Sequence, residues 1–277
     1  MGSAQLEKSL GMKTIHQLGF VKLLDVMGDD EEVENAARIS YGKGTRKVSQ
    51  TRNLIRYLIR HKHTSPLEMC EVKFHLKLPI FIMRQLVRHR TANLNEYSGR
   101  YSVMSNEYYL PEADYLQKQS STNNQGRSEV LPSTGLLHYE FNRIYDNAQI
   151  AYENLLNEEL TKELARAVLP VANYTECIWK IDLHNFFHFV KLRADKHAQR
   201  EIQDYANAMY ELVKPKFPLC CEAFEDYDRD AVTFSKHEME IIKDKLNNIT
   251  ATDRLSGREE TEFLEKIKIG ADNDTAD

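Results

Sequence analysis

The segment MCEVKFHLKLP, residues 69–79, alternates apolar and polar residues more regularly than any other stretch of the chain. This alternation is typical of a β-strand that buries one face against a core. Its apolar residues share one face: Val72, Phe74, Leu76 and Leu78. Pro79 ends the segment, because proline has no N–H to donate within a sheet, and the following IFIMRQLVR favours a helix. A strand that passes directly into a helix at a proline is the firmest constraint on the fold.

The remaining patterns mix strands and helices without the regular alternation that builds a parallel sheet. Further strands are predicted over residues 19–28 and 172–181. Helices are predicted over residues 29–42, 50–63, 135–157, 161–170, 235–247 and 257–268, with one or two more over 182–214. The helix over 50–63 is expected to place Leu54, Tyr57 and Leu58 on its apolar face. The predicted class is α+β, a mixed sheet with long helices.

Three regions are predicted along the chain. Residues 1–14 are expected to form an N-terminal tail, 15–225 the main domain, and 226–277 a charged helical C-terminal extension. Within the main domain, the segment 117–133 is polar and rich in Ser and Asn, so it is predicted to be an exposed loop.

The chain has 277 residues and a formal net charge of −5, which argues against a general polyanion binder. Its four cysteines show no CxxC spacing, so they predict neither a disulfide framework nor a zinc ribbon. They are Cys70, Cys177, Cys220 and Cys221. No signal peptide or apolar run of transmembrane length is visible, so a cytoplasmic location without a membrane partner is expected.

Against this acidic background, residues 84–102 concentrate arginine. The segment contains Arg84, Arg88, Arg90 and Arg100, and its only acidic residue is Glu96. Arg84 and Arg88 would share a face of a helix, because they are four residues apart. Arginine binds phosphate or carboxylate through two parallel N–H donors, so a phosphate pocket is one interpretation. Ion pairs with some of the 42 acidic residues are the other, and charge alone leaves both open.

Other side chains suggest chemistry with less force. Ser98 lacks the GxSxG elbow, so a hydrogen-bonding role is favoured over a nucleophile. Two histidine pairs have spacings that zinc sites use, His61 with His63 and His184 with His188. Arg193 follows an apolar helix face, where it would either approach a ligand or pair with Asp195 or Glu201.

The segment RHRTANLNEYSGRY, residues 88–101, resembles the RHR-x7-S signature of the flavin-dependent thymidylate synthases. Arg88, His89 and Arg90 match the RHR, and Ser98 closes the motif after seven residues. Three further blocks look like this family in the same order: residues 23–42, 61–90 and 165–206. The resemblance covers roughly residues 15–225, and one long motif with three ordered blocks is far more specific than a short pattern.

This resemblance implies reductive methylation of dUMP at C5, which yields dTMP for nucleotide biosynthesis. Methylenetetrahydrofolate would supply the carbon and reduced FAD the hydride, with NADPH reducing the flavin. It also implies a homotetramer of the family's α+β fold, with each active site assembled from several subunits. Neither a metal nor a cysteine nucleophile is implied.

Site residues follow from the resemblance position by position. Those matching the dUMP site are Gln85, Arg88, Glu96, Tyr97, Ser98, Gly99, Arg100, Arg166 and Arg193. Those matching the FAD site are His63, Ser65, Arg88, His89, Arg90, Glu96, Asp182, Leu183, His184 and His188. Arg193 matches the catalytic arginine credited with ionising N3 of the uracil, where a fixed positive charge would stabilise the anion.

Two other functions are weighed beside this one. A zinc hydrolase would use His61, His63, His184 and His188, and would bind zinc but no flavin. A non-catalytic binder of phosphorylated ligands or nucleic acid would use the arginine segment, and its affinity for long oligonucleotides would depend strongly on salt. The family resemblance favours the enzyme, with no nucleic-acid partner.

Overall fold

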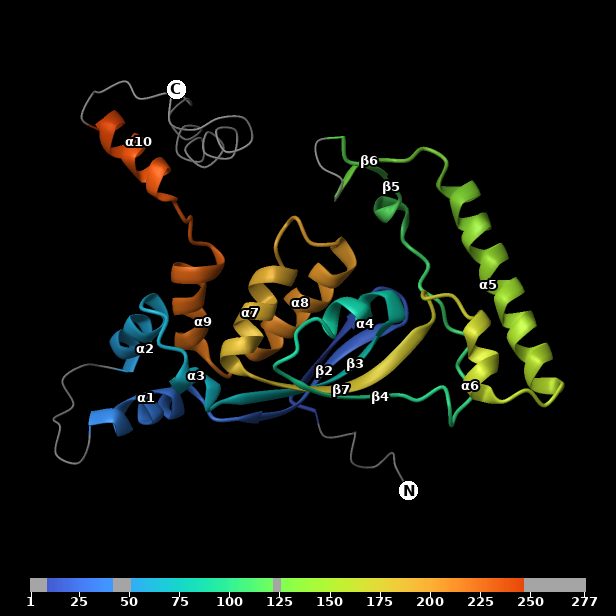
Figure 1. Ribbon diagram of the computed structural model, residues 1–277, viewed down its shortest axis with the longest axis horizontal. Coiled ribbons are helices and arrows are strands. Elements are labelled where there is room, and N and C mark those ends of the chain that lie inside the picture. The colour runs from blue at the N-terminus through green and yellow to red at the C-terminus, as the bar shows by residue number, and fades with distance from the viewer. Residues whose placement is uncertain (1–8, 42–50, 122–125, 247–277) are drawn as a thin grey trace. The chain divides into compact units, whose positions relative to one another are not determined.

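The computed structural model describes residues 9–41, 51–121 and 126–246 (Figure 1). Contacts divide the chain into two compact units, Met1–Arg229 and Asp230–Asp277. None of the helices within the described ranges combines the length and the apolar character needed to cross a membrane. The domain limits expected from the sequence stay a prediction.

A five-stranded sheet organises the first unit, with strand order β1-β2-β3-β7-β4. The strands are β1 Gly11–Ile15, β2 Gly19–Met27, β3 Glu71–Pro79, β4 Asn93–Glu96 and β7 Tyr174–Asp182. All four neighbouring pairs are antiparallel. The α+β class is therefore confirmed, but the expected mixed sheet is wrong. Alternation along one strand reveals its buried face, whereas strand direction depends on how distant segments pair.

Helices cover one face of this sheet, as Figure 1 shows for α7 and α8. These helices and the shorter α4 are Leu183–Arg193, Arg200–Val213 and Ile80–Leu86. The predicted inner face of β3 is confirmed, since Val72, Phe74, Leu76 and Leu78 are at most 1% exposed. Phe74 stacks on Phe186 of α7 with ring centroids 5.8 Å apart. The apolar alternation of β3 thus supplies the floor of the main core.

Further helices complete the unit, and the longest of them is α5, with 24 residues. They are α1 Asp30–Arg38, α2 Thr51–Arg60, α3 Ser65–Glu68, α5 Thr134–Asn157, α6 Lys162–Ala165 and α9 Pro218–Phe224. Short 3-10 turns occupy Ile39–Tyr41, Ala113–Tyr115 and Arg166–Val168, and a π-helical turn occupies Glu225–Arg229. The helices predicted over 29–42, 50–63, 135–157 and 161–170 are confirmed within the described residues. The segment 182–214 forms two helices, because residues 194–199 interrupt it.

Two local expectations are corrected. On α2 the buried residues are Leu54, Ile55, Leu58 and Ile59, whereas Tyr57 is 43% exposed and packs its ring on His61. The polar segment 117–133 is not all loop, because β5 Gln117–Gln119 and β6 Arg127–Val130 pair as an antiparallel hairpin. The polar composition indicated that the segment is exposed, but it gave no indication that two parts of it pair as strands.

The described part of the second unit ends with helix α10, Lys236–Leu246. This helix confirms the one predicted over 235–247. Ile241 is buried against Phe234 and Ile242. The helix predicted over 257–268 lies outside the described residues.

One buried carboxylate ties the start of α1 to the start of α9. Asp30 is 8% exposed and accepts hydrogen bonds from the backbone N–H groups of Leu219 (2.8 Å) and Cys220 (3.0 Å). Asp30→Ala should lower the free energy of unfolding by about 2 kcal/mol, because two buried donors lose their partner. Urea denaturation measures this. Asp25→Ala, whose exposed carboxylate pairs with Lys73, is the control and should cost under about 0.5 kcal/mol; equal losses would contradict the assignment.

Candidate functional site

The arginine segment leaves α4 and runs into the edge strand β4. Because α4 ends at Leu86, Arg84 lies on the helix, while Arg88 and Arg90 lie in the turn that follows. The expectation that Arg84 and Arg88 share a helix face is therefore wrong. The N–H groups of Arg88 and His89 bond back to the carbonyls of Gln85 and Leu86, which holds the turn close to the helix end.

The structure separates the two interpretations of these arginines. Arg100 forms an ion pair with Glu163, Nε to Oε2 2.7 Å. Arg84, Arg88 and Arg90 form no ion pair or hydrogen bond through their side chains with any residue that the structure describes. Exposed guanidinium groups without an acidic partner are available to bind a phosphate or carboxylate.

Arg193, at the end of α7, points at the histidine of the RHR motif. Its Nε donates to Nε2 of His89 at 3.0 Å. Nε2 of His89 must therefore be the unprotonated nitrogen, which leaves the proton on Nδ1. Burial, followed by the charges of Arg193 and His188, lowers the pKa of His89 to about 4. His89 is thus a neutral acceptor at neutral pH, and it orients the guanidinium beside it.

The alternative partners of Arg193 are occupied elsewhere. The carboxylate of Asp195 accepts from the N–H of His197 at 2.8 Å. Glu201 accepts from Arg127 at 2.7 Å. Burial, and then the charge of the neighbouring Arg88, lowers the pKa of Arg193 from its usual range. Arg193 therefore forms no salt bridge with either acid, and its guanidinium lines the adjacent hollow.

The low pKa of His89 makes a testable contribution to acid sensitivity. As the pH falls from about 6.5 towards 4, His89 binds a proton in the unfolded chain but not in the folded chain, so the free energy of unfolding declines. His89→Asn removes this group, so its melting temperature should fall less than that of the wild type over this window. Calorimetry across pH measures it, with His197→Asn at an exposed turn as the control. Parallel profiles for all three proteins would contradict a neutral, buried His89.

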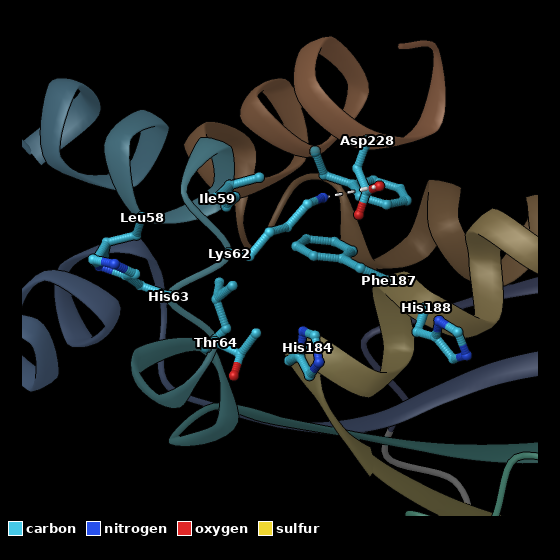
Figure 2. A pocket seen from close by; sticks show the side chains of 11 residues that line it. Leu58, Ile59, Lys62, His63, Thr64, His184, Phe187, His188 and Asp228 are labelled. Atoms are coloured by element: carbon cyan, nitrogen blue, oxygen red, sulfur yellow. Dashed lines mark ion pairs between the residues drawn. The ribbon is translucent and has the colours of Figure 1, made fainter. Parts of the chain in front are cut away.

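Two hollows bring many of the predicted flavin residues together. One is lined by Arg88, His89, Arg90, Thr91, Ile181, Asn185, His188, Leu192 and Arg193. The other, shown in Figure 2, lies between the turn after α2 and the first turns of α7. Among its lining residues are His63, Thr64, His184, Phe187 and His188. His188 lines both hollows, so they adjoin along α7.

The end of α2 places His63 at this hollow. Lys62 has a left-handed backbone with φ 59°, and the N–H groups of Lys62 and His63 bond to the carbonyls of Ile59 and Leu58. This is the Schellman arrangement, which reverses the chain at a helix end. Lys62 then pairs with Asp228 at 3.1 Å, as Figure 2 shows.

Three of the predicted flavin residues are placed differently. The Asp182 carboxylate accepts from the N–H and the side-chain amide of Asn185, so it caps α7. Leu183 is fully buried in the core and donates its N–H to the carbonyl of Cys70. Both residues can reach a ligand chiefly through the backbone. Ser65 is exposed at the start of α3, beside the lining residue Thr64.

A second group gathers beyond the other end of β4. Tyr97 donates its hydroxyl to the carbonyl of Val103, and Ser98 Oγ accepts from the N–H of Arg100 at 3.3 Å. Gly99 is close to Arg166, since a Cβ at this position would lie 3.0 Å from Arg166 Cδ. Ser98 bonds within its own turn and has no histidine partner among the described residues, so nothing activates it as a nucleophile.

The four-residue strand β4 separates these two groups. Asn93 pairs with Lys180 near one end of β7, and Glu96 pairs with Cys177 towards the other. The rise of a strand puts the flanking residues more than about 10 Å apart. Within the described ranges, no hydrogen bond or ion pair joins the Arg88–Arg193 group to the Ser98–Arg166 group.

The zinc hypothesis gains no support from the geometry. Within the described residues, no group of three or more His, Cys, Asp or Glu side chains is placed to hold a metal ion. The four cysteines are buried, as expected of structural thiols. Burial raises the pKa of the Cys70 thiol to about 11, so it is not a reactive thiolate.

Some contributors to the hollows carried no recognisable signal in the sequence. Thr64, Asn185 and Phe187 line them, yet no motif or charge marks these residues. The Arg193–His89 contact joins residues 104 positions apart, so spacing could not reveal it. Helical phase is the one usable signal, since it places His184 and His188 on one face of α7.

Guanidinium and imidazole groups gathered at the edge of an antiparallel sheet are typical of a site for a phosphorylated ligand. Residues 22–219 match the family model described as thymidylate synthase complementing protein. The flavin-dependent thymidylate synthase of Gluconobacter oxydans is 47% identical over 260 residues, which cover 91% of this chain and 84% of the relative. That of Treponema denticola is 46% identical and covers 91% and 95%.

Solved structures agree with the sequence comparisons. The crystal structure of PolB from Streptomyces cacaoi, described as a UMP/dUMP methylase bound with 5-Br dUMP, is similar with a TM-score of 0.71 and 30% identity. The match covers 78% of this chain and 99% of PolB. The chain belongs to the flavin-dependent thymidylate synthase family. It is therefore an enzyme of the methyltransferase class.

Proposed function

We propose that this chain converts dUMP to dTMP by reductive methylation, with methylenetetrahydrofolate as carbon donor, FAD as flavin and NADPH as its reductant. Family membership supports the reaction class. The observation that carries the proposal within this chain is the unpaired Arg88 beside the Arg193–His89 contact. Both features lie at the RHR motif and leave cationic groups facing a hollow.

The residues of the two hollows fit a flavin. Leu58, Ile59, Leu67, Phe187 and Phe224 give the hollow of Figure 2 apolar walls, which suit a flat aromatic ring system. Arg90 offers a donor for the diphosphate of a dinucleotide, and Arg88, which matches both the FAD and the dUMP sites, offers one for either ligand. When bound, FAD in its reduced form would supply a hydride. His63, His184 and His188 would help to hold the flavin, and the apolar walls would exclude water.

The group beyond β4 fits a nucleotide monophosphate. Arg100 and Arg166 provide the charge, while the backbone at Ser98 and Gly99 and the Ser98 hydroxyl provide further donors. Gly99 lets Met104 and Arg166 pack closely, since a Cβ there would lie 2.8 Å from Met104 Sδ and would make that side chain shift. The Nε of Arg100 is bonded to Glu163, which orients the remaining N–H donors of the Arg100 guanidinium. Arg193 supplies a fixed positive charge to the uracil as N3 becomes anionic, and it cannot act as a base.

We propose that each active site combines groups from different subunits of a homotetramer. The two hollows have cavity volumes of ≈ 280 and ≈ 70 Å³, below the about 300–1,000 Å³ typical of ligand pockets. The outer side of α5 also exposes large apolar residues: Leu136, Tyr139 and Ile150, at 63, 61 and 56%. Contact with another copy of the chain would cover these residues.

A titration with dUMP tests the proposed anion site. Arg88→Ala should weaken dUMP binding about 10- to 100-fold, because hydrogen bonds to charged groups contribute about 1.5–3 kcal/mol. Isothermal calorimetry on the flavin-loaded protein measures the affinity. Lys73→Ala removes a cation paired with Asp25 on the sheet and should bind dUMP as the wild type does. Unchanged affinity in Arg88→Ala would remove Arg88 from the nucleotide site.

A further inference from the structure

A hydrogen-bonded relay connects the β5–β6 hairpin to Gln85. Arg127, in β6, donates through one NH2 to both oxygens of Glu201 at 2.7 Å. Glu201 Oε2 also accepts from the side-chain amide of Gln199 at 2.9 Å. The amide oxygen of Gln199 in turn accepts from Nε2 of Gln85 at 2.6 Å. The relay therefore runs from a hairpin of no assigned role to a residue expected to touch dUMP.

The relay has a direction that Arg127 and Glu201 impose. Glu201 is 2% exposed, and an ionised carboxylate only accepts hydrogen bonds. Gln199 must then turn its NH2 towards Glu201 and its oxygen towards Gln85. Gln85 must turn its own NH2 towards Gln199, which leaves its carbonyl oxygen facing away from the relay. An amide can adopt two nearly isosteric orientations that exchange its O and NH2, and the charge of Glu201 selects one of them for both Gln199 and Gln85.

Arg127 keeps Glu201 ionised. Burial by itself would raise the pKa of Glu201. The hydrogen bond and charge of Arg127 outweigh this effect, and hydrogen bonds that include the one from Gln199 add to it, so the pKa is lowered. Tyr109 also donates its hydroxyl to Oε1 of Glu201, at 3.0 Å. Removal of Arg127 would leave the buried carboxylate with neutral donors but without a cationic partner, which favours binding of a proton. A protonated Glu201 could donate to Gln199 and allow both amides to turn over.

We propose that Arg127, through Glu201 and Gln199, is a positioning residue that fixes Gln85 with its carbonyl oxygen towards the nucleotide. The proposal rests on the proposed function, because it takes Gln85 as a dUMP contact. With its phosphate ionised, dUMP carries only two hydrogen-bond donors, the uracil N3–H and the ribose 3′-OH. An oriented carbonyl of Gln85 accepts from one of them, and a turned amide would face that donor with a donor of its own.

Two variants test the relay at different points. Gln199→Ala cuts it while leaving the Arg127–Glu201 pair intact, and it should weaken dUMP binding about 5- to 10-fold. Arg127→Gln should weaken binding to a similar degree, and its affinity should fall further as pH drops and Glu201 becomes protonated. The double variant should be no worse than Arg127→Gln alone, because both changes act on one path. Arg127→Lys keeps the charge and should restore most of the affinity.

The measurements are dUMP affinity by calorimetry from pH 5.5 to 8.5, melting temperature, and NADPH-driven flavin reduction on the flavin-loaded protein. Flavin reduction should stay at the wild-type rate in each variant. Lys118→Gln, in the same hairpin and paired with exposed Glu129, is the control and should match wild type throughout. An Arg127→Gln chain that fails to fold leaves Gln199→Ala to decide.

The possible results separate failure of the relay from failure of the proposed function on which it rests. Wild-type protein that neither holds flavin nor binds dUMP would overturn the proposed function. Wild-type protein that does both, with Gln199→Ala and Arg127→Gln binding dUMP equally well at every pH, would overturn the relay alone. A lower melting temperature with unchanged dUMP affinity would also overturn it, since the Arg127–Glu201 pair would then be structural only.

Discussion

Replacing Arg193 with alanine should reduce dTMP formation by at least about 10²–10³-fold, the range seen when a preorganised donor to a developing anion is lost. NADPH should still bleach the flavin of this variant. Arg193 touches His89 and lines the hollow, and no acidic side chain among the described residues pairs with it. Under the proposed function its charge would be available to the uracil as N3 becomes anionic, whereas hydride transfer from NADPH to the flavin would not depend on it.

Single-turnover assays separate the two half-reactions. Flavin absorbance reports the reductive step, and radiolabelled dTMP reports methylation. Arg193→Lys is the matched control: it keeps the charge but loses the planar fork, so it should fall between wild type and alanine. Near-normal methylation by Arg193→Ala would show that the assigned role is wrong, and loss of flavin reduction would place Arg193 in the other half-reaction.

The second large effect is complementation between inactive chains. Arg193 and Arg166 belong to groups on opposite sides of β4, and the resemblance implies sites shared between subunits. Arg193→Ala and Arg166→Ala should each be nearly inactive alone. Coexpressed in equal amounts, they should recover about one quarter of wild-type activity, because random assembly gives about one site in four with both arginines intact.

Two different affinity tags allow the mixed assemblies to be isolated before assay. The double variant coexpressed with wild type controls for dilution of active sites. Activity in the mixed assemblies no higher than in either parent would show that each chain supplies both arginines of its own site. It would leave the reaction unchanged and correct the account of how the site is built.

Sequence patterns predicted the elements well where local chemistry decides them. The alternation of β3 and the acidic start of α1 both reflect hydrogen bonding and burial within a few residues. Strand direction was missed, as was the hairpin within 117–133, because polar residues at 117–119 and 127–130 pair without an apolar pattern. Tyr57 was assigned to the wrong face, because its ring packs on His61 at the surface.

The site shows the same division between local and distant information. The RHR motif and the histidine pair of α7 were visible as short patterns, and their residues line the two hollows. The Arg193–His89 contact was not visible, nor were the Arg127–Glu201 and Gln199–Gln85 contacts of the relay, because these contacts join residues 104, 74 and 114 positions apart. Local spacing cannot report such contacts, since the sheet and its helices create them.

The visible spectrum of the purified full-length protein shows whether this chain uses a flavin to methylate dUMP. The protein should be yellow, and NADPH should bleach its absorbance under anaerobic conditions. Adding dUMP and methylenetetrahydrofolate should then restore the oxidised spectrum as dTMP forms. A colourless protein that binds no added FAD, or one whose reduced flavin stays reduced with both substrates present, would contradict the claim.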